Sequence, residues 1–159
     1  MQNYKVPSAN LEETISIGKR IGAKLRGGEV FELVSDLGGG KTSFVSGVSQ
    51  GFGSIDPVSS PSFTISYIYG RADGKALHHF DFYRLEDAGV VGNELAEVAG
   101  DESIVVAVEW GEIVHDVLPA ERVTVQISSP STDSREFTFS YPEKYQYLFG
   151  TLSKDEQTL

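Results

Sequence analysis

A glycine-rich segment stands between an apolar run and an amphipathic run, and it is the clearest chemical feature of this sequence. It reads SDLGGGKT over residues 35–42. Glycines let consecutive backbone N–H groups turn toward phosphate oxygens, and the first turn of a following helix adds the positive end of its dipole. Lys41 is then expected to reach the β- and γ-phosphates of a nucleotide, and the Thr42 hydroxyl to bind a magnesium ion. The segment therefore predicts a phosphate-binding loop.

Ser35 is the one departure of this segment from the usual pattern of such loops, G-x-x-x-x-G-K-[ST], which begins with glycine. A simpler interpretation is a glycine-rich turn from a strand to a helix, with an incidental lysine. The amides that surround the phosphates belong mainly to residues 38–42. Ser35 is therefore expected to affect the start of the loop and the turnover rate more than phosphate binding itself.

Two acidic side chains are candidates for the metal and water chemistry that a nucleotide-hydrolysing site needs. Glu109 ends the apolar run IVVAVE, and Asp81 directly follows the run ALHHF. Taken alone, each has the simpler interpretation of a solvated acid at the end of a strand. The presence of the phosphate loop favours the metal-binding role for Glu109.

Four neighbouring side chains carry weaker signals. His78 and His79 are adjacent in an expected strand, so they point to opposite faces and are not expected to share a zinc ion. Histidines with internal partners or on the surface are the better interpretation. Trp110, the only tryptophan, is by composition a packing residue. Arg84 is most simply a surface charge, although it could reach a phosphate or a partner.

The elements that must position these residues follow from apolar periodicity and turn signals. Asn10 and Glu13 form a capping-box pattern before the first helix, and Asp73-Gly74 is a hairpin signal. The run 103–109 is apolar throughout and is expected to be a central strand. Helices are predicted over 11–26, 41–52 and 93–99, and strands over 29–34, 62–69, 76–83, 103–109, 122–128 and 136–141. This order predicts an α/β fold, a three-layer P-loop NTPase sandwich with a mixed β-sheet.

Length and composition bound the remaining possibilities. The 159 residues fit a single domain over 1–159 with a polar tail from about Ser153, and 40% hydrophobic content is typical of a folded chain. A formal charge of −10 disfavours direct nucleic-acid binding. The chain has no cysteine, and we find neither a secretion signal nor an apolar run long enough for a membrane span. We expect a cytoplasmic protein.

Four motifs in a fixed order resemble those of one family. They read SDLGGGKTSF, SSPSFTIS, HHFDFYRL and VEWGE, and they are similar to GDLGAGKTTF, SPTFTLV, HFDLYRL and EWPE of the TsaE (YjeE) family. The resemblance extends from about Thr14 to Arg135. It implies an ATPase with ATP or ADP and Mg²⁺ as ligands, which acts with the TsaB–TsaD pair when a threonylcarbamoyl group is transferred to a tRNA adenosine beside the anticodon. The transfer chemistry is implied to lie on a partner, and contact with tRNA to be indirect.

The same resemblance implies roles for individual positions. It assigns Thr42 and Glu109 to Mg²⁺, and Asp81 to the hydrolytic centre together with Lys41 and Glu109. The implied switch or partner residues are Ser60, Thr64, Tyr83 and Arg84. The implied nucleotide-binding residues are Thr14, Gly38, Gly39, Gly40, Lys41, Thr42, Ser43, Trp110 and Arg135. Ser35, Ser62 and Gly111 depart from the family pattern, and only Ser35 bears on catalysis.

Two other functions compete with this interpretation. A small P-loop metabolite kinase shares the loop but must shield its acceptor from water, and the chain has neither lysine nor arginine between Arg84 and Arg122 to form an arginine-rich lid. A nucleotide-binding interaction module with a decayed loop would explain Ser35. A GTPase is disfavoured because no N-K-x-D motif is present. Hydrolysis by the chain alone is expected to be slow, because no resident arginine finger accompanies the water-orienting acid.

Overall fold

The computed structural model describes residues 1–35, 40–55, 57–59, 66–82, 89–109 and 114–150. Over these ranges the strands form an eight-stranded sheet in the order β1-β8-β7-β2-β6-β5-β4-β3. The strands are β1 (Gln2–Ser8), β2 (Val30–Val34), β3 (Pro57–Ser59), β4 (Ser66–Gly70), β5 (Ala76–Asp81), β6 (Ile104–Glu109), β7 (Val123–Ser128) and β8 (Arg135–Tyr141). The helices are α1 (Leu11–Gly22), α2 (Lys41–Phe52), α3 (Gly89–Val98) and the 3₁₀ helix η2 (Glu143–Leu148).

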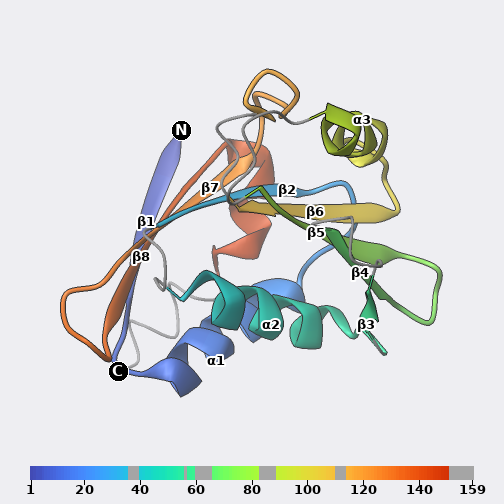
Figure 1. Ribbon diagram of the computed structural model, residues 1–159. Coiled ribbons are helices and arrows are strands. Elements are labelled where there is room, and N and C mark those ends of the chain that lie inside the picture. The colour runs from blue at the N-terminus through green and yellow to red at the C-terminus, as the bar shows by residue number, and fades with distance from the viewer. Residues whose placement is uncertain (36–39, 56, 60–65, 83–88, 110–113, 151–159) are drawn as a thin grey trace.

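The sheet is mixed and is covered on both faces. Strands β7, β2, β6 and β5 are mutually parallel, and the outer pairs on each side are antiparallel. Helices α1 and α2 lie against one face, and α3 lies against the other (Figure 1). This arrangement confirms the predicted three-layer α/β fold with a mixed sheet, and it confirms that the apolar run of β6 is central.

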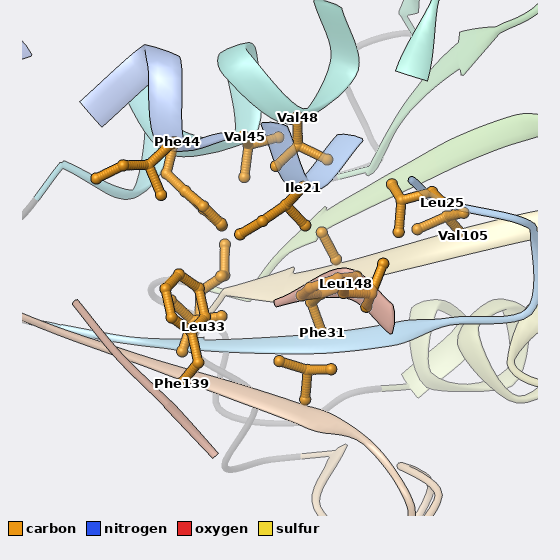
Figure 2. Packing of buried hydrophobic residues seen from close by; sticks show 14 of the residues in the cluster. Ile21, Leu25, Phe31, Leu33, Phe44, Val45, Val48, Val105, Phe139 and Leu148 are labelled. Atoms are coloured by element: carbon orange, nitrogen blue, oxygen red, sulfur yellow. The ribbon is translucent and has the colours of Figure 1, made fainter. Parts of the chain in front are cut away.

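Alternation of side chains along the central strands divides the core into two clusters. Val105 and Ala107 of β6 pack under α1 and α2, whereas Val106 and Val108 pack on the side of α3. Figure 2 shows the larger cluster, in which helix residues such as Phe44 lie over the strands. A strand that is buried on both faces must be apolar throughout, which explains the continuous run in the sequence.

Helix α1 begins as the sequence predicts but ends earlier. The Asn10 side chain accepts a hydrogen bond from the Glu13 N–H at 2.9 Å, and the Glu13 carboxylate accepts one from the Ala9 N–H at 2.7 Å. The α-helix ends at Gly22 rather than at the predicted residue 26. The next residues form a tighter turn, since Lys24 N–H and Leu25 N–H donate to the carbonyls three residues back. The apolar spacing continues through this turn, so the spacing did not indicate where the α-helix ends.

Glycines bring α1 and the loop helix α2 into close contact. A Cβ atom placed on Gly22 would lie 2.2 Å from the Val48 carbonyl oxygen, and one on Gly47 would lie 2.2 Å from the Ile15 carbonyl oxygen. Such distances are far inside van der Waals contact, so only glycine fits at this crossing. Helix α1 is thereby locked to the helix that starts at Lys41.

Over the described residues, the remaining strands agree with the prediction in type and differ by one residue at an end. Residues 62–65 and 83, also predicted to be in strands, lie outside the described residues. β4 and β5 form the expected hairpin around Gly74, which has a φ of +90°, and β7 and β8 form the second antiparallel pair. Strands β1 and β3 and the helix η2 were not predicted from the sequence. β1 is an edge strand that contains Pro7 and lacks a strong apolar alternation, and β3 spans three residues. Both become strands through pairing with β8 and β4.

Helix α3 begins at Gly89, four residues before the predicted start at Asn93. The added residues GVVG comprise two glycines and two β-branched valines, which have weak helix propensity. In the described ranges, no helix combines the length and the apolar character that crossing a bilayer requires. The predicted tail from Ser153 lies outside the described residues.

Candidate nucleotide site

The candidate site lies at one edge of the sheet, where the central parallel strands end. Asp81 on β5 and Glu109 on β6 are register partners, and Glu109 is also the partner of Leu33 on β2. The chain leaves β2 at this edge and returns as α2. The carboxyl ends of parallel strands are the usual ligand-binding edge of such sheets. The fold therefore brings both predicted acids next to each other, at the edge where β2 leads into the predicted phosphate loop.

Gly40 ends the loop in a conformation suited to anion binding. It is the N-cap of α2, has a φ of +98° and provides no side-chain cap for the first turn of the helix. The first turn of α2 also contains no acidic residue. The N-terminal amides of α2 therefore keep their capacity to bind an anion. Gly38 and Gly39 lie outside the described residues.

Lys41 is buried, and its side chain is directed toward Ser35. Its Nζ donates a hydrogen bond to the backbone carbonyl of Ser35 at 3.2 Å, and the residue is 6% exposed. A glycine at position 35 would offer the same carbonyl. The serine that departs from the loop pattern therefore supports this contact through its backbone and not through its side chain.

A cavity of about 310 Å³ adjoins the start of α2. Its volume is near the lower end of roughly 300–1,000 Å³ for small-molecule sites. Four residues predicted to bind nucleotide line it, namely Thr14, Gly40, Ser43 and Arg135. Sequence reasoning missed the other three lining residues, which are Leu11, Thr132 and Asp133. The capping pattern predicted the start of α1, and the turn-rich segment predicted a loop before β8. Neither pattern indicated that these two segments lie side by side.

Thr14 belongs to a short chain of hydroxyl groups at the wall of this cavity. Its Oγ1 lies 2.7 Å from Ser8 Oγ, and Ser8 Oγ donates to the Asn10 carbonyl at 2.9 Å. A hydroxyl has one hydrogen to donate, so Thr14 must donate to Ser8. The lone pairs of Thr14 Oγ1 are left as acceptors. Ser8 was not singled out in the sequence, because its partner lies on a different element.

Arg135 packs beside the end of the loop and holds a turn. A Cβ atom on Gly40 would lie 3.5 Å from Arg135 Nε, which is ordinary contact. Its Nη1 donates to the carbonyls of Ser131, Thr132 and Ser134, the last at 2.8 Å. Arg135 therefore holds the turn between β7 and β8 and packs it beside Gly40.

Glu109 is buried and pairs with His79. His79 Nε2 lies 2.5 Å from Glu109 Oε2, and the two side chains are 8% and 5% exposed. His78 lies on the opposite face next to Phe80, where burial lowers the pKa of its imidazole. The structure confirms that the two histidines point apart and that His79 has an internal partner. Sequence reasoning missed the pairing with Glu109, which depends on the register of β5 and β6.

The donor set at this edge fits a magnesium ion. Within the described ranges, Glu109 Oε1 and the exposed Thr42 hydroxyl have no hydrogen-bond partner, and both are the hard oxygen ligands that Mg²⁺ takes. Burial raises the pKa of nearby Tyr69, and the Tyr67 phenol and the Glu109 carboxylate raise it further. Five other predicted site residues, Trp110, Ser60, Thr64, Tyr83 and Arg84, lie outside the described residues.

Comparisons with known proteins point to one family. A family model described as "Threonylcarbamoyl adenosine biosynthesis protein TsaE" matches residues 8–137. The TsaE protein of Bacillus subtilis is 36% identical, with 98% of each chain covered. That of Treponema pallidum is 32% identical, with 82% of this chain and 96% of the relative covered. The crystal structure of Bacillus subtilis YdiB superposes with a TM-score of 0.76 at 33% identity and covers 98% of this chain and 97% of that chain.

Proposed function

The chain belongs to the TsaE family, whose relatives are named tRNA threonylcarbamoyladenosine biosynthesis proteins, and on this premise we propose that it binds and hydrolyses Mg-ATP. In this proposal it acts with the TsaB–TsaD pair when a threonylcarbamoyl group is transferred to a tRNA adenosine beside the anticodon. The transfer itself takes place on a partner. The protein meets tRNA only through that complex, in the cytoplasm.

One observation carries the ATP-binding part of the proposal. Residues from α1, the start of α2 and β8 line a single cavity at the end of the phosphate loop. A base and a ribose need such a hollow beside the amides that hold the phosphates. Thr14 and Arg135 stand on its wall although they are distant in the chain.

The chain's own residues divide the chemical work. The amides of residues 38–42 and the Lys41 ammonium bind the phosphates, and Thr42 and Glu109 hold the magnesium ion. When bound, the ion neutralises charge that develops on the phosphate oxygens. Asp81, the register partner of Glu109, orients the attacking water.

We propose that Thr14, in the hydroxyl chain at the cavity wall, faces the six position of the base and so favours adenine. Thr14 donates to Ser8 and can only accept from a ligand. Adenine carries an amino donor at its six position, where guanine carries a carbonyl acceptor. Trp110 is proposed to stand near the nucleotide as well.

Partner contact is the remaining part of the proposal. The chain has 23 acidic and 13 basic residues, which favours a protein partner over the phosphate backbone of tRNA. The proposed contact residues are Ser60, Thr64, Tyr83 and Arg84. Without an arginine finger of its own, the protein hydrolyses ATP slowly until the partner supplies the missing charge.

Calorimetric titration with Mg-ATP and Mg-GTP tests nucleotide binding. Lys41→Ala should weaken Mg-ATP binding by at least about 100-fold because a direct charge contact to phosphate is lost. Lys19→Ala, which removes an exposed lysine from α1, should leave binding unchanged.

Thr14→Val should reduce the preference for ATP over GTP by about five-fold, which corresponds to the loss of one hydrogen bond. A folded wild-type protein that gives no heat with either nucleotide at millimolar concentration would contradict the proposal.

Two experiments test the proposed action with TsaB–TsaD. One is a pull-down of the pair, and the other measures phosphate release with and without it. We expect capture of the pair and faster hydrolysis in its presence. Equal turnover in both conditions, together with no capture, would limit the protein to nucleotide binding. Transfer of the γ-phosphate to a metabolite faster than release of free phosphate would instead favour the kinase.

A further inference from the structure

We propose that His79 is a positioning residue: its Nε2–H holds Glu109 Oε2, so that Oε1 is kept for the cation of the nucleotide complex. This inference rests on the proposed function and adds to it a residue that was not assigned to the site. The role is indirect, because His79 acts through Glu109. Four observations support it.

The first observation is the length and burial of the contact. His79 Nε2 and Glu109 Oε2 are 2.5 Å apart, and both side chains are almost completely buried. An ionised carboxylate only accepts hydrogen bonds, so Nε2 carries the hydrogen. A hydrogen bond to a charged group in a dry environment is strong and directional. The contact therefore fixes the orientation of the Glu109 carboxylate.

The second observation is the use of only one carboxylate oxygen. In the described part of the chain, His79 is the single side chain that hydrogen-bonds to Glu109. Among the described residues, the buried polar side-chain atoms without a hydrogen-bond partner do not include Oε1, so this oxygen is accessible from outside. An accessible carboxylate oxygen that meets no protein donor can coordinate a cation.

The third observation is the strand register. In the β5–β6 pair, His79 is opposite Ala107 and Asp81 is opposite Glu109. The small Ala107 side chain leaves room for the imidazole to lean along the strand toward Glu109. His79 and Asp81 lie two residues apart and so point to the same face. One strand thus provides both the positioning residue and the acid proposed to orient water.

The fourth observation is the aromatic side chain beside the pair. Tyr67 on β4 is the register partner of His79, and the centroids of the two rings are 6.1 Å apart. The tyrosine ring limits the sideways freedom of the imidazole. The histidine is therefore held by packing as well as by its hydrogen bond, as a second sphere of a metal site requires.

Manganese binding to the ADP complex tests this role without relying on hydrolysis. Mn²⁺ substitutes for Mg²⁺ and is counted by electron paramagnetic resonance while ADP is saturating. His79→Leu removes the donor, whereas His79→Gln keeps an N–H near the position of Nε2. His78→Leu is the matched control, because this neighbour lies on the opposite face beside Phe80. ADP affinity in the presence of a chelator is measured for every variant.

We expect His79→Leu to weaken Mn²⁺ binding about 10- to 100-fold, the usual effect of losing an outer partner of a ligand, while ADP affinity without metal changes less than about two-fold. His79→Gln should recover most of the Mn²⁺ affinity, and His78→Leu should match the wild type. If His79→Leu does not fold, His79→Asn replaces it with the same expectation, since its amide is too short to reach Oε2.

Three results would overturn the inference. The first is wild-type Mn²⁺ affinity in His79→Leu. The second is an equal loss of metal-free ADP affinity, which marks a general structural role. The third is a wild-type protein that binds no ADP in either condition, and this result alone also contradicts the proposed function.

Discussion

Two buried glutamates at opposite ends of the central strands show how differently the fold treats a charged side chain. Glu29 directly precedes β2, and Glu109 ends the neighbouring parallel strand β6. They are 1% and 4% exposed. Both side chains are buried, so burial alone does not separate them.

Their hydrogen bonds do separate them. Glu29 Oε1 accepts from the Gly27 N–H at 2.7 Å, and Oε2 accepts from the Arg26 N–H at 2.8 Å and from the Tyr147 hydroxyl at 2.6 Å. Glu109 has His79 on one oxygen. A carboxylate with donors on both oxygens stabilises the fold, whereas one with an open oxygen is prepared for a ligand. The comparison predicts opposite effects for the same substitution at the two positions.

The largest difference between glutamine substitutions at the two positions should be in the rate of ATP hydrolysis. Glu109→Gln should lower the rate of ATP hydrolysis by at least about 100-fold, because a neutral amide binds Mg²⁺ poorly. Glu29→Gln should change this rate by less than about two-fold, since a mutation outside the site leaves the reacting groups in place. Single-turnover phosphate release measures both. Equal losses in the two variants would remove the distinction between the two acids.

The free energy of unfolding should be lowered more by Glu29→Gln than by Glu109→Gln. Glu29→Gln replaces an acceptor oxygen by an NH₂ group that faces a backbone or hydroxyl donor, and we expect a loss of about 1–3 kcal/mol in the free energy of unfolding. In Glu109→Gln the amide oxygen still accepts from His79, and we expect a loss below about 1 kcal/mol. Urea unfolding with a shared m-value compares the two. A larger loss for Glu109→Gln would contradict the structural assignment of Glu29.

Removing one donor from Glu29 should have a smaller effect. Tyr147→Phe deletes the hydroxyl but keeps the ring that lies 3.9 Å under the Arg26 guanidinium carbon. We expect a loss of about 1 kcal/mol in the free energy of unfolding, because two backbone donors remain. Tyr4→Phe, at the edge strand, serves as a comparison for the loss of a hydroxyl. No loss in Tyr147→Phe would show that the backbone donors suffice for Glu29.

The smallest effect concerns alkaline pH. Burial, followed by the hydrogen bond and the charge of Glu29, raises the pKa of the Tyr147 phenol above its ordinary value of 10.0. The folded state therefore keeps a proton that the unfolded state releases, so this contribution to stability is present below pH 10 and is lost as the pH rises further. The free energy of unfolding of Tyr147→Phe, measured with urea, should decline less steeply than that of the wild type between pH 9.5 and about 11. An unchanged slope would assign the alkaline loss to other tyrosines.

Local patterns predicted those parts of the molecule whose structure depends on near neighbours. Helix α2 and strand β6 were predicted almost to the residue, because continuous apolar runs and flanking glycines define them. The edge strand β1 was missed, because β8 supplies its partner from the other end of the chain. Helix α3 was predicted too short, since its first residues carry weak helix propensity.

For the candidate site, the sequence by itself was enough to predict the phosphate loop and the two acids. Glycines, Lys41 and Thr42 are contiguous, so their chemistry follows from local order, and the acids end recognisable strands. Only the tertiary structure decided which side chains share the cavity and that His79 holds Glu109. The physical reason is that strand register and the close approach of α1 to α2 depend on contacts between segments distant in sequence, which no local pattern records.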